Sequence, residues 1–124
     1  MRLFTSLTCL AMTLGAAASA QDVQEGAALY ADFCAVCHGE SLQGDGPMAE
    51  VMTVPPTDLT QLAQGAEFPV LDVARQIDGR ARIAAHGGEM PLFGRYFEGQ
   101  RPDVALEGPG GQPILVSRPI ADLI

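Results

Sequence analysis

The sequence predicts a small domain of helices and long irregular loops, and three observations lead to this prediction. Residues 23–35 and residues 71–85 place apolar side chains at three- and four-residue steps, as one face of a helix requires. The stretch between them is interrupted by glycines and prolines, which excludes a continuous helix there. No βαβ pattern is visible. We therefore expect helices and loops to share one core.

Residues 1–20 have the form of a cleavable export signal. Arg2 supplies a positive start, residues 3–14 are apolar, and Ala18-Ser19-Ala20 offers the small residues that a signal peptidase requires. The apolar run is shorter than the roughly 20 residues of a membrane-spanning helix. We expect cleavage before Gln21. Cys9 then stays in the leader, and residues 21–124 form one periplasmic domain with no stable membrane insertion.

The first helix is expected over about residues 23–35. Asp22 and Glu25 have the spacing of a capping box at its start. Gly26 and Tyr30 lie one turn apart, and Cys34 comes at the end of the segment. Gly26 costs about 1 kcal/mol relative to alanine in a helix interior. A close crossing by another helix would explain that cost, and a tolerated defect is the alternative.

The middle of the chain is expected to form a loop and then two helices. Residues 39–57 predict an irregular loop, which is either plain surface or a wall beside a bound cofactor. Thr57 is the expected cap of a short helix that ends near Leu62. Residues 71–85 predict a helix that Gly79 weakens without ending and that His86-Gly87-Gly88 stops.

The tail has two further elements. Apolar residues alternate on both sides of Gly108-Pro109-Gly110-Gly111, which indicates a small hairpin, with a loop as the alternative. Residues 119–124 begin a last helix, in which Pro119 is expected to take the first helical position.

Cys34-Ala35-Val36-Cys37-His38 carries the clearest chemical signal in the chain. Two thiols three residues apart, followed at once by an imidazole, are the groups that covalent haem attachment needs. Cys34 and Cys37 would add to the haem vinyl groups, and His38 would bind the iron. A disulfide, a redox dithiol or half of a metal site are the alternatives. The adjacent histidine favours haem.

Met90 is the expected second iron ligand. It lies in Gly88-Glu89-Met90-Pro91-Leu92-Phe93-Gly94, where proline and glycine can fix a loop that aims the thioether. Such a neutral sulfur stabilises ferrous over ferric iron. Met48 and Met52 are rivals on the loop that follows His38. His86 would give bis-histidine ligation if it bound iron.

The charge is strongly negative. The chain has seven arginines, no lysine and 15 acidic residues, for a formal net charge of −8. Loss of Arg2 with the leader makes it −9. This balance argues against nucleic acid as a partner, because phosphates require a basic face. It suits docking to a redox protein with a basic docking face. The alternative is that the acidity only keeps the protein soluble.

With these motifs, the sequence resembles a class I c-type cytochrome of the bacterial periplasmic kind. The resemblance implies an all-α cytochrome c fold, with three to four helices and long loops around one haem c. It also implies two thioether bonds, His/Met ligation and single-electron transfer between redox partners. In that family the carbonyl of a proline in the first loop often accepts a hydrogen bond from Nδ1–H of the proximal histidine. The matching proline here is Pro47, and Pro55 is a weaker candidate. The matching features cover most of residues 22–97: Gly26 and Tyr30, residues 34–39, 44–47 and 56–59, and residues 86–94.

The tail departs from the family pattern. The family's last helix continues for two or three turns and packs against the first helix near Gly26, whereas only six residues remain here from Pro119. We expect that six residues cannot cover that face, so the C-terminal helix is truncated relative to the family's. The alternative is a domain that closes without this crossing.

The expected function is that of an electron carrier rather than an enzyme, because no catalytic residues stand out. One alternative is a haem c subunit or domain of an oxidoreductase complex. Another is a ligand-binding or peroxidase-like haem protein, if Met90 is displaced from the iron. Arg80, Arg82 and Arg95 are candidates for pairing with the haem propionates.

Overall fold

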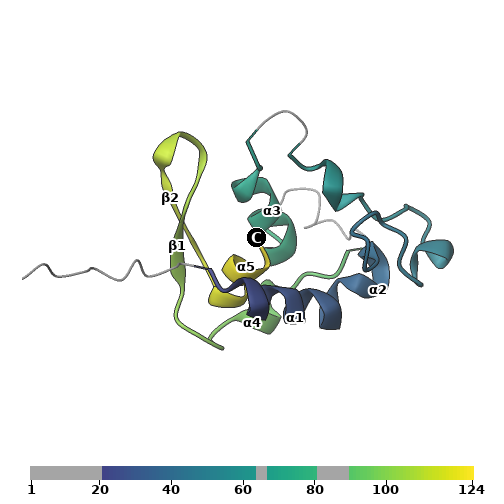
Figure 1. The fold of residues 1–124 in the computed structure, drawn as a ribbon. Helices are drawn as coiled ribbons and strands as arrows, with labels where there is room; N and C mark the ends of the chain where they lie inside the picture. The colour runs from purple at the N-terminus through teal and green to yellow at the C-terminus, as the bar shows by residue number, and fades with distance from the viewer. Residues whose placement is uncertain (1–20, 64–66, 81–89) are drawn as a thin grey trace, which may run out of the picture.

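The computed structural model describes residues 21–63, 67–80 and 90–124 (Figure 1). The expected leader and the expected helix stop at residues 86–88 lie outside the described residues. The described part is mainly helical and has one two-stranded sheet. Its elements are α1 (Val23–Phe33), α2 (Ala35–His38), η1 (Ala49–Val51), η2 (Leu59–Gln61), α3 (Val70–Asp78), α4 (Gly94–Phe97), β1 (Val104–Glu107), η4 (Pro109–Gly111), β2 (Pro113–Val116) and α5 (Arg118–Leu123).

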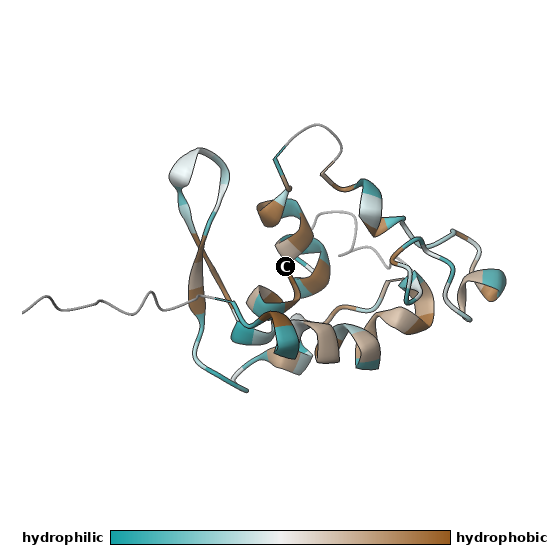
Figure 2. Ribbon diagram, in the orientation of Figure 1, coloured by the Kyte–Doolittle hydropathy of each residue, from teal (hydrophilic) through white to brown (hydrophobic). Residues whose placement is uncertain are grey.

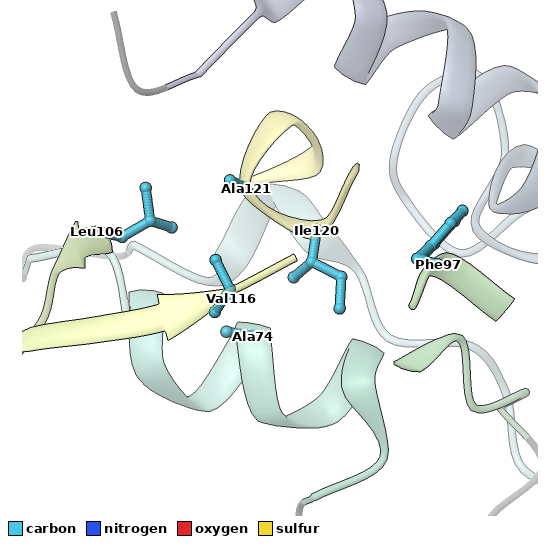
Figure 3. Packing of buried hydrophobic residues seen from close by; sticks show 6 residues of the cluster. All are labelled: Ala74, Phe97, Leu106, Val116, Ile120 and Ala121. Carbon is cyan, nitrogen blue, oxygen red and sulfur yellow. The ribbon is translucent and has the colours of Figure 1, made fainter. Parts of the chain in front are cut away.

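The core lies where α3, α4, α5 and the hairpin meet. α3 shows apolar and polar residues in succession along its turns, as an amphipathic helix does (Figure 2). The close-up in Figure 3 places Ile120 and Ala121 of α5 at the centre of the cluster. Burial of these side chains is the main favourable term for a domain of this size. The buried apolar residues are Ala74, Phe97, Leu106, Val116, Ile120 and Ala121.

The start of α1 confirms half of the predicted capping box. The Asp22 side chain accepts from the backbone N–H groups of Gln24 and Glu25, both at 3.1 Å. The reciprocal half is replaced by tertiary contacts. The Asp22 N–H donates to Asp122 at 2.8 Å, and Glu25 pairs with Arg101 at 2.7 Å. The first helix therefore begins as predicted, and its first turn is bonded to Asp122 and Arg101.

Gly26 lies at a close crossing between α1 and α5. A Cβ placed on Gly26 would overlap the backbone carbonyl of Asp122, so only glycine allows this approach. The expectation that six residues cannot cover this face is wrong, because α5 is six residues long and reaches Gly26. Ser117 lies at the N-cap position of α5 without a side-chain capping bond, and Arg118 is the first helical residue, so Pro119 takes the second position rather than the first.

The structure tests the predictions for three further segments: the short helix after the first loop, the end of α3 and the hairpin. The short helix after the first loop is the 3₁₀ helix η2, and its cap is Asp58 rather than Thr57, because the Asp58 side chain accepts from the Thr60 N–H at 2.9 Å. Gly79 ends α3 in a left-handed conformation with φ of 92°, so the expectation that it only weakens the helix is wrong. The hairpin forms, with Val104 paired to Val116 and Glu107 paired to Pro113.

Candidate functional site

Cys37 and His38 lie on α2, which follows α1 (Figure 1), and Cys34 is the cap residue between the two helices. The Cys34 N–H still donates to the Tyr30 carbonyl at 2.9 Å, so α1 fixes where the motif begins. Both thiols are free and half-buried, so the disulfide alternative does not apply to this structure. Burial, and to a lesser degree the charge of Cys37, raises the pKa of the Cys34 thiol.

The first loop folds back onto the backbone of α2. The N–H groups of Gly44 and Gly46 donate to the carbonyls of His38 and Cys37 at 2.9 and 3.1 Å. A Cβ on Gly46 would lie 2.6 Å from the carbonyl oxygens of both Ala35 and Val36, which is too close for any side chain. The loop therefore packs closely on the backbone of the motif, and its role as a wall beside a bound cofactor stays a prediction.

His38 is oriented through one ring nitrogen. Its Nδ1 lies 3.0 Å from the backbone carbonyl of Thr57, so Nδ1–H donates there and Nε2 is the nitrogen that can bind a metal. The expectation that Pro47 supplies this carbonyl is wrong, and Pro55 is not the acceptor either. Every residue has a backbone carbonyl, so no side-chain signal could have singled out Thr57.

Tyr30 contacts the backbone directly after the motif. Its hydroxyl donates to the carbonyl of Gly39 at 2.7 Å, one residue after His38. Burial raises the pKa of the Tyr30 phenol, with smaller contributions from Cys34 and Asp45. The neutral phenol that can donate this hydrogen bond is therefore the favoured form.

Met90 lies on a loop that is attached to the end of α3. The Phe93 N–H donates to the carbonyl of Ile77 at 2.9 Å, and Leu92 packs where Gly79 has no side chain. Met90 is half-buried, and its Sδ lies 3.8 Å from Nε2 of Gln76 on α3. The sequence analysis missed Gln76. Its position 14 residues before Met90, on the polar side of a helical pattern, gave no signal for this contact.

An aromatic cluster brings the two halves of the candidate site together. The Phe33 ring, next to Cys34, packs edge-to-face on Phe93 with ring centroids 6.0 Å apart. Phe33 makes similar contacts with Tyr96 and Phe97 of α4, at 5.2 and 5.8 Å. Such pairs contribute about 0.5–1.5 kcal/mol each beyond their buried area. The Cys34–His38 motif and the Met90 loop are thus attached to one packed unit.

The donor set fits a haem c. It offers two free thiols for thioether bonds, an imidazole with Nε2 available, and a thioether sulfur on a separate element. Within residues 21–63, 67–80 and 90–124, no three His, Cys, Asp or Glu side chains gather as a metal site. Of the candidate propionate partners, Arg80 pairs with Asp78 and Arg95 is exposed. Arg82 and His86 lie outside the described residues.

Comparisons with known proteins give one match. Residues 23–105, more than half of the chain, match the protein family described as cytochrome c. No curated protein and no solved structure gives a match. None of the helices in the described part of the chain has the length and apolar character needed to cross a membrane.

Proposed function

The chain belongs to the cytochrome c family, and from this premise we propose that it is a periplasmic monohaem cytochrome that carries single electrons between redox proteins. When bound, haem c supplies an iron that cycles between the ferrous and ferric states. The proposal assigns thioether attachment to Cys34 and Cys37, proximal ligation to His38 and the second axial position to Met90.

The observation that carries this proposal is the way His38 is held. An imidazole whose Nδ1–H donates to a backbone carbonyl is fixed in one tautomer, with Nε2 free to bind iron. The same hydrogen bond makes Nε2 of the ring a stronger electron-pair donor to a metal. Two free thiols at the preceding positions are the partners that covalent attachment requires. This combination supports haem c more than any of the alternatives for two cysteines.

Met90 supports the carrier function over the ligand-binding alternative. Its loop is bonded to α3 through Phe93 and Ile77, so the thioether is attached to a packed helix rather than to a free segment. A sulfur held in this way would be available to bind the haem iron, and its binding would disfavour external ligands. Met48 and Met52, the rivals, lie in the first loop, where Met48 is exposed.

We propose that partners dock at the exposed face of the first loop. Three exposed apolar residues lie close together there, because the Met48 N–H donates to the carbonyl of Val36 on α2 at 2.9 Å and the Val51 N–H donates to the Met48 carbonyl at 3.1 Å. Asp45 and Glu50 are exposed on the same loop. An apolar patch with acidic neighbours suits a partner with a basic docking face, and it predicts electron transfer that slows as salt rises.

The function is tested by a redox titration of the haem-loaded protein from a host with haem-maturation machinery. A carrier is expected to show a reversible one-electron transition and no binding of carbon monoxide in the ferrous state. Carbon monoxide binding by the unaltered protein would instead favour the ligand-binding alternative. A transition that cannot be reversed would also contradict the carrier function.

A further inference from the structure

We propose that Gln76 is a positioning residue for Met90. Its side-chain amide donates a hydrogen bond to the thioether sulfur, and in the haem-loaded protein this bond raises the reduction potential and stabilises sulfur ligation. The inference rests on the proposed function, because it assumes that Met90 is the second axial ligand. It adds a residue that the sequence motifs do not contain.

The geometry places donor and acceptor within hydrogen-bonding distance of each other. Nε2 of Gln76 lies 3.8 Å from Sδ of Met90, and both side chains are half-buried. Gln76 lies in the last turns of α3, and the Met90 loop is bonded to the next residue of that helix, since the Phe93 N–H donates to the Ile77 carbonyl at 2.9 Å. This backbone bond holds the loop that follows Met90 against the same end of α3 that carries Gln76.

A second contact fixes the same loop against α3. The Leu92 side chain packs at Gly79, where an added Cβ would lie 3.1 Å from its carbon atoms. Gly79 itself holds φ of 92°, which side-chain-bearing residues rarely adopt. Met90 is therefore followed by two anchors to the end of α3, and Gln76 is the donor that this helix presents to the sulfur.

The chemistry of the thioether allows both roles at once. A thioether sulfur has two lone pairs and is a weak hydrogen-bond acceptor. One lone pair can bind iron while the other accepts from the amide. Donation to the sulfur withdraws electron density from it, so the sulfur stabilises ferric iron less and ferrous iron relatively more. A neutral amide does this without adding a charge to the site.

The test compares two variants with the unaltered haem-loaded protein. Gln76→Leu removes the donor and keeps a side chain of similar size. Gln76→Glu keeps the shape and replaces the donor with a carboxylate at neutral pH. We expect a lower midpoint potential for Gln76→Leu, and a still lower one for Gln76→Glu because a negative charge favours ferric iron. Gln24→Leu, at an exposed position of α1, is the matched control and should keep the original potential.

The outcomes separate the two proposals. A Gln76→Leu potential equal to that of Gln24→Leu, with sulfur ligation intact, would overturn the role of Gln76 and leave the carrier function standing. If the unaltered protein lacks covalently attached haem or methionine ligation, both the role of Gln76 and the proposed function are overturned. If Gln76→Leu does not fold, proton NMR of the reduced native protein decides. A nuclear Overhauser contact between the Gln76 amide and the Met90 methyl supports the proposal, and an amide that exchanges freely with solvent contradicts it.

Discussion

Single residues on both sides of the Cys34–His38 motif determine how the imidazole is presented. The Thr57 carbonyl accepts from His38 Nδ1–H at 3.0 Å, and the Tyr30 hydroxyl donates to the Gly39 carbonyl at 2.7 Å. The first bond selects the tautomer, and the second holds the backbone that follows the ring. The bond to Thr57 spans 19 residues, so the orientation of the ring depends on how the first loop folds.

Tyr30→Phe should destabilise the haem-loaded protein by about 1 kcal/mol at neutral pH, the usual net worth of one hydrogen bond. The raised pKa of Tyr30 means that the folded state favours the neutral phenol. This contribution is present below the ordinary tyrosine pKa of about 10 and is lost as pH rises through the raised value. Denaturant titrations at neutral and alkaline pH measure both effects. Tyr96→Phe, at an exposed ring, is the control, and equal midpoints for the two variants would contradict the expectation.

Met90→Ala should keep the haem attached, lower the midpoint potential and allow carbon monoxide to bind the ferrous protein. The reason is that a soft neutral ligand that favours ferrous iron is removed and a coordination position opens. Optical spectra before and after addition of carbon monoxide measure the change. Met48→Ala and Met52→Ala are the controls and should resemble the unaltered protein. A methionine-ligated spectrum that survives in Met90→Ala would assign the ligand to another residue.

The candidate site residues stand out in the sequence, whereas the contacts that support them do not. Cys34, Cys37, His38 and Met90 carry side chains whose chemistry is distinctive at their spacing. The Thr57 carbonyl and the Gln76 amide belong to groups that occur throughout any sequence. Their roles follow from where the loop and α3 place them, and no pattern in the sequence specifies that placement.

At the scale of elements, the crossing of α1 and α5 packs α1, the helix that precedes the Cys34–His38 motif, against the core. Gly26 makes the approach possible, since a Cβ there would overlap the Asp122 carbonyl. α5 contributes Ile120 and Ala121 to the buried cluster. Because Cys34 is both the C-terminal cap of α1 and the N-terminal cap of α2, this crossing also helps to position the candidate attachment residues.

Gly26→Ala should destabilise the protein by about 1–3 kcal/mol, the usual cost of forcing extra atoms into a packed contact. Helix propensity alone would predict the opposite, a gain of about 1 kcal/mol. Thermal unfolding measures the difference. The matched control is Ala28→Gly at an exposed position of α1, which should cost about 1 kcal/mol through propensity. A stabilised Gly26→Ala variant would show that the helices do not cross closely.

Element starts and ends were predictable to different degrees. The cap at Asp22 was correct because it depends on local side-chain chemistry. The end of α3 at Gly79 was not predicted, because a glycine within a periodic pattern can either be tolerated or adopt the left-handed conformation that ends a helix. The crossing of α5 over Gly26 required tertiary packing to decide, although the sequence already indicated that such a contact would explain the glycine.

At the scale of the whole molecule, Asp122 joins the start of α1 to α5, 100 residues later in the sequence. Its side chain is fully buried, and one carboxylate oxygen accepts from the Asp22 N–H at 2.8 Å. Arg101 and Arg118 lie 3.7 and 3.9 Å from its oxygens. A further bond runs from the Gln21 side chain to the Ala121 carbonyl at 3.2 Å. These contacts fix the beginning of α1 onto α5.

Asp122→Ala should lower the free energy of unfolding by about 2 kcal/mol, because it removes the charged acceptor of the Asp22 N–H. Asp122→Asn should cost less, since its amide oxygen can still accept. Arg101→Ala is the control and should cost less than about 1 kcal/mol, because its partners are reached from an exposed position. Denaturant midpoints measure all three. An Asp122→Ala midpoint equal to that of Arg101→Ala would show that the carboxylate does not join α1 to α5.

Peptide mapping by tandem mass spectrometry, applied to the exported and denatured protein, tests the central claim most directly. One haem is expected on the peptide that contains Cys34 and Cys37. The haem should be retained in Cys9→Ala and lost when Cys34 and Cys37 are both replaced by alanine. A haem-free peptide from a maturation-competent host, or haem that separates from the chain on denaturation, would contradict it.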